Sequence, residues 1–157
     1  MNKKIVLASK SNVRKNILEN NGLNCIVKPA NIDEETVKES LIREGATPLL
    51  ISKNLAELKA NKISESLNEE VVIGADSVID LDGHIISKPS SRKEAMEILK
   101  KLNGKIHYLI SSVCVSKNGQ MIWNYTDKAS LTMKNMSNSD LEEYLSKITD
   151  ENLYAYN

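Results

Sequence analysis

Two short turn signals, Asp82-Gly83 and Lys117-Asn118-Gly119, constrain the fold of this 157-residue chain most strongly. Each separates two extended apolar segments, and Asp-Gly or Asn-Gly in that setting is typical of a tight β-hairpin. Elsewhere strand-like and helix-like segments alternate, which alone would indicate a parallel sheet with crossover helices. Because the hairpins interrupt this alternation, the sequence predicts an α/β fold with a mixed sheet and flanking helices.

Apolar runs and helical spacing locate the individual elements. Extended runs predict strands across residues 3–8, 23–27, 71–75, 78–81, 84–87, 108–115 and 121–133. Apolar residues at helical spacing predict helices that contain residues 13–18, 37–42, 47–67, 95–102 and 141–148. Thr47, Ser90 or Ser91, and the segment Ser137–Asp140 are expected to cap the last three of them. Residues 31–35 are expected to form a polar connection, and Leu153, Tyr154 and Tyr156 are expected to belong to a further strand.

The composition predicts one domain and excludes several classes of protein. Basic and acidic residues number 21 each, with one Trp, five Tyr and no Phe. Zero net charge and few stacking side chains argue against a nucleic-acid partner. No apolar run is long enough for a membrane span or a signal peptide, so we expect a cytoplasmic protein without a membrane partner. Cys25 and Cys114 lie far apart in apolar runs, which favours buried thiols over a disulfide or a zinc site.

Residues 9–14, Ser-Lys-Ser-Asn-Val-Arg, follow the first predicted strand and open the first predicted helix. Free backbone N–H groups at a helix start, two hydroxyls and the guanidinium of Arg14 suit a phosphate group. Strand-to-helix loops are also where open α/β sheets place ligands. A plain capping sequence with a surface arginine is the alternative, and it is favoured on this segment alone because no glycine-rich phosphate loop is present.

Asp76 follows the apolar run Val71–Ala75 and precedes Ser77. A carboxylate at the end of a buried strand can bind a metal ion or act as a base. A strand-end aspartate can equally cap a turn. The residues around Asp76 favour neither interpretation over the other.

Two further groups carry charges that a polyphosphate site needs. Pro89 restricts the backbone after Lys88, whose ammonium group could then balance phosphate charge. Asp33, Glu34 and Glu35 offer carboxylate ligands for magnesium. The commoner alternatives are an exposed lysine at a helix entrance and a solvated acidic loop.

These groups occur in the order found in one enzyme family. The sequence resembles the Maf family of nucleoside triphosphate pyrophosphatases over essentially the whole chain. The matching segments are, in order, Leu7–Ser11 with Arg14 and Leu18, Ile32–Glu34, Leu58–Ala60, Ile73–Val78 with Leu81–Gly83 and Ser87–Pro89, and Glu94–His107. Each motif is short, but five in the right order make a chance match improbable.

The resemblance implies a mixed α/β sheet in a two-lobed body with a central cleft, an architecture like that of inosine triphosphatases. It implies hydrolysis of a standard or modified nucleoside triphosphate to the monophosphate and pyrophosphate, as house-cleaning of the nucleotide pool. It also implies a divalent cation, Mg²⁺ or Mn²⁺, as the cofactor.

The resemblance also assigns roles to individual residues by their position in the motifs. Asp76 would accept the proton, and Lys59 and Lys88 would neutralise the triphosphate as further catalytic groups. Glu34 would bind the metal ion together with Asp76. The substrate-binding residues would be Ser9, Ser11, Arg14 and Ser77.

The chain departs from the family at three places. Asn12-Val13 and Ser77 stand where members often carry other residues, near the positions that read the base, so the preferred nucleotide stays open. The family continues beyond residue 157 with a base-reading Gln, so we expect a short C-terminus. The sheet edge left open by it would favour a homodimer. The alternative to an enzyme is therefore an inactive nucleotide-binding module that acts through a partner.

Overall fold

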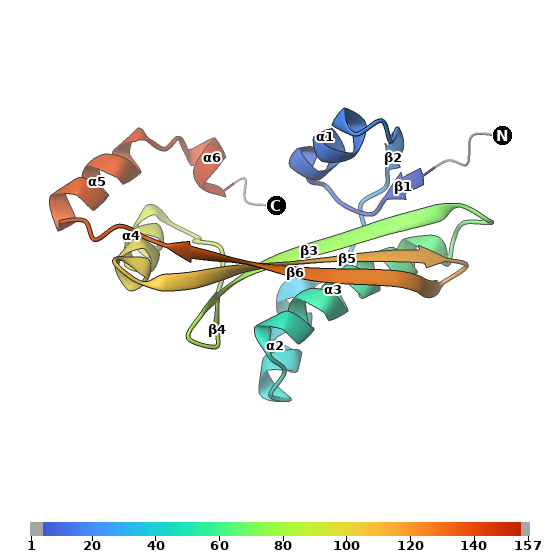
Figure 1. The fold of residues 1–157 in the computed structure, drawn as a ribbon, viewed down its shortest axis with the longest axis horizontal. Coiled ribbons are helices and arrows are strands. Elements are labelled where there is room, and N and C mark those ends of the chain that lie inside the picture. Colours follow the sequence, from blue (N-terminus) through green and yellow to red (C-terminus); the bar gives the residue numbers. More distant parts are fainter. Residues whose placement is uncertain (1–4, 155–157) are drawn as a thin grey trace. The chain divides into compact units, whose positions relative to one another are not determined.

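The structure, a computed structural model, describes residues 5–154, which form six strands and six helices (Figure 1). The strands make one sheet in the order β2-β1-β3-β5-β6, with β4 paired to β3. Their bounds are Ile5–Leu7 (β1), Cys25–Val27 (β2), Val71–Leu81 (β3), His84–Ile86 (β4), Ile106–Lys117 (β5) and Gln120–Thr132 (β6). β1 pairs with β2 and β3 in parallel, whereas β4 pairs with β3 antiparallel. The predicted mixed sheet is therefore confirmed.

Short polar side chains fix where the helices begin. The helices are Asn12–Asn20 (α1), Glu34–Arg43 (α2), Pro48–Ser64 (α3), Arg92–Leu102 (α4), Asn138–Lys147 (α5) and Asp150–Tyr154 (α6). Thr47 caps α3 with a proline directly after it, and Ser137 forms a capping box with Asp140 at the start of α5. Such caps satisfy backbone N–H groups that a helix leaves unpaired at its first turn. None of the described helices is long and apolar enough to cross a membrane.

The predicted hairpin at Asp82-Gly83 is confirmed by its backbone. Asp82 and Gly83 both have positive φ angles, of 52° and 82°. A two-residue hairpin with positive φ at both positions matches the right-handed twist of the strands that it joins. The turn pairs Leu81 with His84 in the antiparallel register of β3 and β4.

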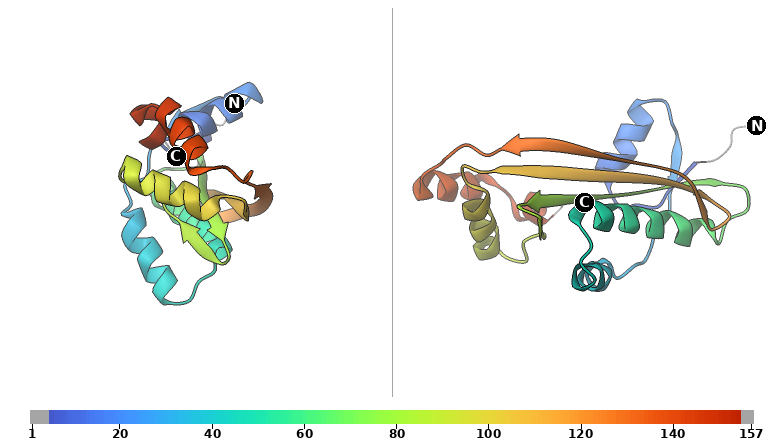
Figure 2. Two further views of the ribbon diagram at one scale, coloured as in Figure 1. Left: turned by 90° about the vertical axis from the view of Figure 1, so that its left-hand side faces the viewer. Right: turned by 60° about the horizontal axis from the view of Figure 1, so that its bottom comes forward.

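The described residues divide into two compact units. The first comprises residues 5–77 and 110–127, and here α2 and α3 lie on one side of the sheet and α1 on the other (Figure 2). Its buried core joins α3 to the central strands through Val6, Ala8, Ala56, Ala60, Val72 and Cys114. The second unit comprises residues 78–109 and 128–154, where Ala95, Leu145 and Leu153 form a smaller core between α4, α5 and α6. The single domain predicted from the sequence stays a prediction.

Four expectations from the sequence are corrected. β3 does not stop before Asp76 but continues to Leu81, so Asp76 lies near the middle of the strand. The connection at residues 31–35 ends early, because α2 begins at Glu34. Leu153 and Tyr154 belong to α6 and not to a strand, and Tyr156 lies outside the described residues. Both cysteines are free, but only Cys114 is buried, whereas Cys25 is half-buried.

Arg92 holds the C-terminal end of α5 in the second unit. Its guanidinium donates to the backbone carbonyls of Leu145 and Ile148 at 3.0 and 2.7 Å and to Asp150 Oδ1 at 2.9 Å. Arg92→Ala is expected to lower the free energy of unfolding by about 1–2 kcal/mol, because the Ile148 carbonyl and Asp150 lose a donor and the Leu145 carbonyl loses one of two. The measurement is the midpoint of chemical denaturation. Lys100→Ala, which removes only an exposed ion pair with Glu97, is the control; equal midpoints for the two variants would contradict the assignment.

Candidate active site

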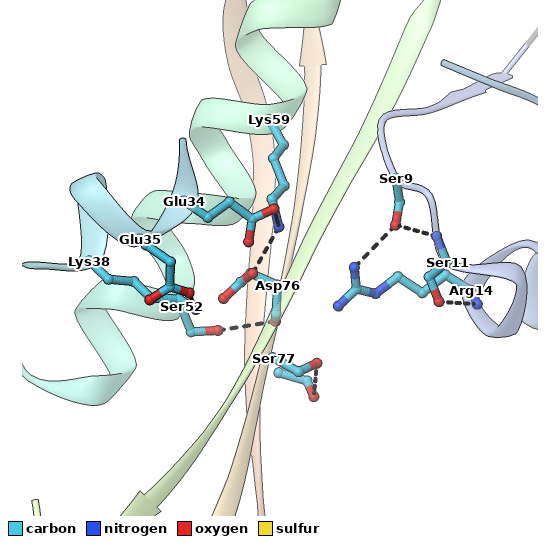
Figure 3. A network of polar contacts seen from close by, with 11 residues as sticks. Ser9, Ser11, Arg14, Glu34, Glu35, Lys38, Ser52, Lys59, Asp76 and Ser77 are labelled. Carbon is cyan, nitrogen blue, oxygen red and sulfur yellow. Dashed lines mark hydrogen bonds and ion pairs between the residues drawn. The ribbon is translucent and has the colours of Figure 1, made fainter. Parts of the chain in front are cut away.

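Asp76 lies in the part of β3 that packs very closely against helix α3. Gly74, two residues earlier, faces α3: a Cβ atom there would lie 2.7 Å from the backbone nitrogen of Ala60 and closer still to the carbonyl oxygen of Ala56. Because glycine lets α3 come this near, Lys59, which precedes Ala60, can reach the strand. Lys59 Nζ lies 2.9 Å from Asp76 Oδ1 (Figure 3).

Protein encloses both partners of this ion pair. Asp76 is 5% exposed and Lys59 is 6% exposed. Ser52, on the same face of α3, donates from its Oγ to the backbone carbonyl of Asp76 at 3.1 Å, which fixes the strand where the carboxylate projects. Asp76 Oδ2 has no hydrogen-bond partner among the described residues. Since buried polar atoms are normally satisfied, this oxygen is suited to a ligand.

α2 brings a second carboxylate to the same lysine. Asp33 caps this helix by accepting from the backbone N–H and the hydroxyl of Thr36, so Glu34 is its first residue. Glu34 Oε1 lies 3.0 Å from Lys59 Nζ, and the Glu34 side chain is 39% exposed. Lys59 is therefore shared by two carboxylates, of which one is buried and one is partly open to water.

Burial raises the pKa of Asp76 above its usual range, and the charge of Lys59 opposes that rise. A raised pKa brings the carboxylate closer to the range in which it exchanges protons at neutral pH. Burial also lowers the pKa of Arg14, and the charges of Asp76 and Glu34 offset part of that effect. Arg14 therefore lies within electrostatic range of both carboxylates.

The loop between β1 and α1 forms a compact group of hydroxyls around Arg14. Ser9 Oγ accepts from the backbone N–H of Ser11 at 3.1 Å and from Arg14 Nη1 at 3.2 Å. Ser11 caps α1 by accepting from the backbone N–H of Arg14 at 3.3 Å, and both serines are buried. The predicted phosphate-binding residues thus lie together, with the arginine already oriented by its neighbours.

The other two predicted site residues are Ser77 and Lys88. Ser77 is exposed and points to the opposite face of β3 from Asp76, because successive strand residues alternate. Its Oγ lies 3.0 Å from the Oγ of Ser111 on β5. Lys88 is exposed and lies between β4 and α4 in the second unit. A role for either residue stays a prediction.

Of the acidic triplet at 33–35, only Glu34 contacts the buried lysine. Asp33 is the helix cap, and Glu35 forms an ion pair with Lys38 at 3.1 Å. Of these three predicted magnesium ligands, only Glu34 therefore stays a candidate.

Three polar residues of this region were missed by the sequence analysis. Ser52 lies seven positions before Lys59, and Lys38 lies four positions after Glu34. Both spacings put side chains on one face of a helix, so helical periodicity could have found them. Ser111 meets Ser77 through the register of β5 on β3, and no local pattern signals that.

The two carboxylates fit a divalent cation that keeps most of its water ligands. Residues 5–154 contain no group of three His, Cys, Asp or Glu side chains placed to hold a metal ion. Mg²⁺, however, commonly binds through one or two carboxylates together with the substrate phosphates. Asp76, with its unpartnered Oδ2, and the partly exposed Glu34 are the residues that would hold it.

The sequence profile of Maf-like proteins matches residues 4–154. The chain belongs to the Maf family. A nucleoside triphosphate pyrophosphatase of Pelagibacter ubique (strain HTCC1062) is 68% identical to this Maf-like chain over 157 residues, which are 100% of the chain and 80% of the relative.

A further relative and one solved structure extend the comparison. A 7-methyl-GTP pyrophosphatase of Brucella abortus biovar 1 (strain 9-941) is 36% identical, with 96% of the Maf-like chain and 75% of the relative covered. The solved structure of a HAM1 protein from Coxiella burnetii superposes with a TM-score of 0.52 at 14% identity, covering 81% of this chain and 70% of that one. At that identity the likeness concerns the fold alone, and it confirms the predicted α/β class.

Proposed function

We infer that this Maf-like chain is a nucleoside triphosphate pyrophosphatase, a hydrolase that releases pyrophosphate and a nucleoside monophosphate. Membership of the family over residues 4–154 supports the reaction class. The observation that carries the inference is Asp76: a buried carboxylate with one oxygen on Lys59 and the other unpartnered among the described residues. We propose that its substrate is a standard or modified nucleoside triphosphate that the cell must remove from its nucleotide pool.

In the reaction that we propose, Asp76 takes the proton of the water molecule that attacks the α-phosphorus, and pyrophosphate leaves. A positioned carboxylate is the group needed for that proton. Lys59 holds Asp76 in place and adds positive charge where the phosphate oxygens gain negative charge. Such transfers depend mainly on positioning and electrostatics, which a rigid strand and helix provide.

The remaining cations and hydroxyls serve the triphosphate in this proposal. Arg14, oriented by Ser9 and Ser11, binds a phosphate group. Lys88 supplies a further positive charge, and Ser77 contacts the nucleoside. Pro89 directly follows Lys88 and restricts its backbone, and Ser77 directly follows Asp76 on β3.

Glu34 and Asp76 are proposed to hold Mg²⁺ or Mn²⁺, which would withdraw charge from the phosphate oxygens when bound. Removal of divalent ions with a chelator is expected to abolish turnover and to leave the thermal unfolding midpoint within a few degrees. Glu34→Gln is expected to raise the Mn²⁺ concentration needed for half-maximal activity by about tenfold, because one of two anionic ligands is lost. Full activity in the chelator would contradict the cofactor assignment.

The direct test of function is pyrophosphate release from a panel of common and modified nucleoside triphosphates, with Mg²⁺ and with Mn²⁺. Stoichiometric pyrophosphate and monophosphate from at least one substrate is the expected result. A folded protein that binds triphosphates but releases nothing from any of them would instead fit an inactive nucleotide-binding module.

We also propose a homodimer in the cytoplasm, where nucleoside triphosphates are made and used. β6 is the last strand in the sheet order, and Ile122, Trp123 and Tyr125 on it are each more than half exposed. A long edge strand that exposes apolar side chains is a ready partner for another chain. Light scattering at several concentrations is expected to give twice the 17.5 kDa chain mass, and Ile122→Lys to lower it. A mass of one chain at every concentration would contradict the dimer.

A further inference from the structure

Lys38 is a largely enclosed cation on α2, a helix at the protein surface. No residue of α2 is fully buried, and Glu39 and Arg43 on the same helix are exposed. The side chain of Lys38 is nevertheless only 14% exposed. A lysine on a helix surface normally extends its ammonium group into water, so an enclosed one directs its charge toward the protein.

The ion partner of Lys38 does not account for this enclosure. Lys38 Nζ lies 3.1 Å from Glu35 Oε1, but the Glu35 side chain is 68% exposed. An ion pair one helical turn apart with a solvated carboxylate contributes little, and it exchanges easily. Lys38 is therefore a positive charge held near the site by a partner that can leave at low cost.

The position of Lys38 ties it to the buried carboxylates. It lies four residues after Glu34, hence on the same face of α2. Glu34 contacts Lys59, and the charge of Lys38 lowers the pKa of Asp76, opposing the effect of burial. Figure 3 shows the Lys38 side chain beside this group of residues.

Two other cations that we assign to the triphosphate, Lys59 and Arg14, already have partners. Lys59 is shared by Asp76 and Glu34, so its single charge offsets only part of the negative charge of an incoming polyphosphate. Arg14 is hydrogen-bonded to Ser9. A phosphate oxygen is a stronger partner for an ammonium group than an exposed carboxylate is, because it carries more charge and is held by the rest of the substrate.

We propose that Lys38 is a further substrate-binding residue of this Maf-like chain, which exchanges Glu35 for an oxygen of the pyrophosphate part of the triphosphate. The inference rests on the proposed function, because it takes the polyphosphate to bind beside Asp76. It predicts opposite effects for the two members of one ion pair. Loss of Lys38 weakens pyrophosphate binding, whereas neutralisation of Glu35 leaves that binding intact or strengthens it.

The test is binding of magnesium pyrophosphate to the whole chain by calorimetry, together with kcat and KM for the best nucleotide. Lys38→Met is expected to weaken pyrophosphate binding and to raise KM, each by about tenfold, because one charge-assisted contact is lost, with kcat changed by less than about twofold. Lys38→Arg is expected to restore most of the binding. Lys53→Met, on α3 and outside the site, is the matched control.

Two results would overturn the proposal. One is pyrophosphate binding by Lys38→Met that equals binding by Lys53→Met. The other is an equal loss in Glu35→Gln and Lys38→Met, which would make the pair a structural element only. The proposed function fails separately: a chain that binds pyrophosphate through Lys38 but hydrolyses no triphosphate would refute hydrolysis and retain this binding residue.

Discussion

Replacement of Asp76 by Asn is expected to lower kcat by about 10²–10⁴-fold, the usual contribution of a positioned general base. Asn keeps the shape of the side chain and can still accept a hydrogen bond from Lys59, but it cannot take a proton from water. The backbone carbonyl of residue 76 keeps its bond from Ser52, so the strand stays in place. The measurement is turnover of the best triphosphate at saturating metal and substrate.

The stability of Asp76→Asn shows whether a loss of turnover comes from the missing base or from unfolding. Because burial raises the pKa of Asp76, its ionised form disfavours the folded state, and this unfavourable contribution grows as pH rises through the raised pKa. Asn removes that contribution but also removes a charge partner of Lys59, which then keeps Glu34 alone. The two effects oppose each other, so the unfolding midpoint is expected to move by only a few degrees.

A matched control is available on the same strand. Asp80→Asn makes the identical chemical change at a residue that accepts a hydrogen bond from Gly83 in the hairpin. This variant is expected to keep turnover within about threefold of the starting protein. Asp80 is not the proposed general base, so its replacement does not remove the contribution of about 10²-fold or more that such a base makes. If Asp76→Asn and Asp80→Asn were equally active, Asp76 would have no part in proton transfer.

Gly74→Ala is expected to be the most destabilising single substitution in the first unit, with a loss of about 3 kcal/mol in the free energy of unfolding. The added methyl would meet backbone atoms of Ala56 and Ala60 rather than the end of a flexible side chain. Relief requires α3 to move away from β3, and Lys59 is carried on that part of α3. Activity is therefore expected to fall together with stability. Urea denaturation followed by circular dichroism measures the loss in the free energy of unfolding.

Gly45→Ala provides the comparison for this prediction. Gly45 has a φ of +79°, but nothing lies within 4 Å of a Cβ atom at that position. Alanine there costs only the left-handed backbone conformation, about 1 kcal/mol. A loss at Gly74 that does not exceed the loss at Gly45 would show that α3 and β3 are not in the close contact on which the position of Lys59 depends.

Local chemistry was enough to predict the turns and most helix starts of this fold. Asp82-Gly83 adopts the positive φ angles that its residue types favour, and Thr47 and Ser137 cap the helices expected after them. These features depend on residues within a few positions of one another. They could therefore be predicted from the sequence without tertiary information.

Tertiary contacts explain the errors. A polar Asp-Ser pair after an apolar run suggested that β3 ends at Asp76, but Lys59 and Ser52 on α3 satisfy the polar groups there and the strand continues. Leu153 and Tyr154 suggested a strand, yet Leu153 is buried against α4 and α5 from a helix. In both cases packing partners distant in the sequence outweighed the local preference.

The candidate site was predictable as a set of residues but not as an arrangement. Family motifs pointed to Glu34, Lys59 and Asp76, and no spacing in the sequence shows that one lysine joins both carboxylates. That contact requires α3 to lie against Gly74. Lys38 carried no motif at all, because its significance arises only from its enclosure beside these residues.

The most direct test of the central claim is hydrolysis of the best triphosphate in water enriched in oxygen-18, with the products analysed by mass spectrometry. Attack on the α-phosphorus predicts the label in the nucleoside monophosphate and none in the pyrophosphate. Label in the pyrophosphate, or release of inorganic phosphate in place of pyrophosphate, would contradict the proposed reaction.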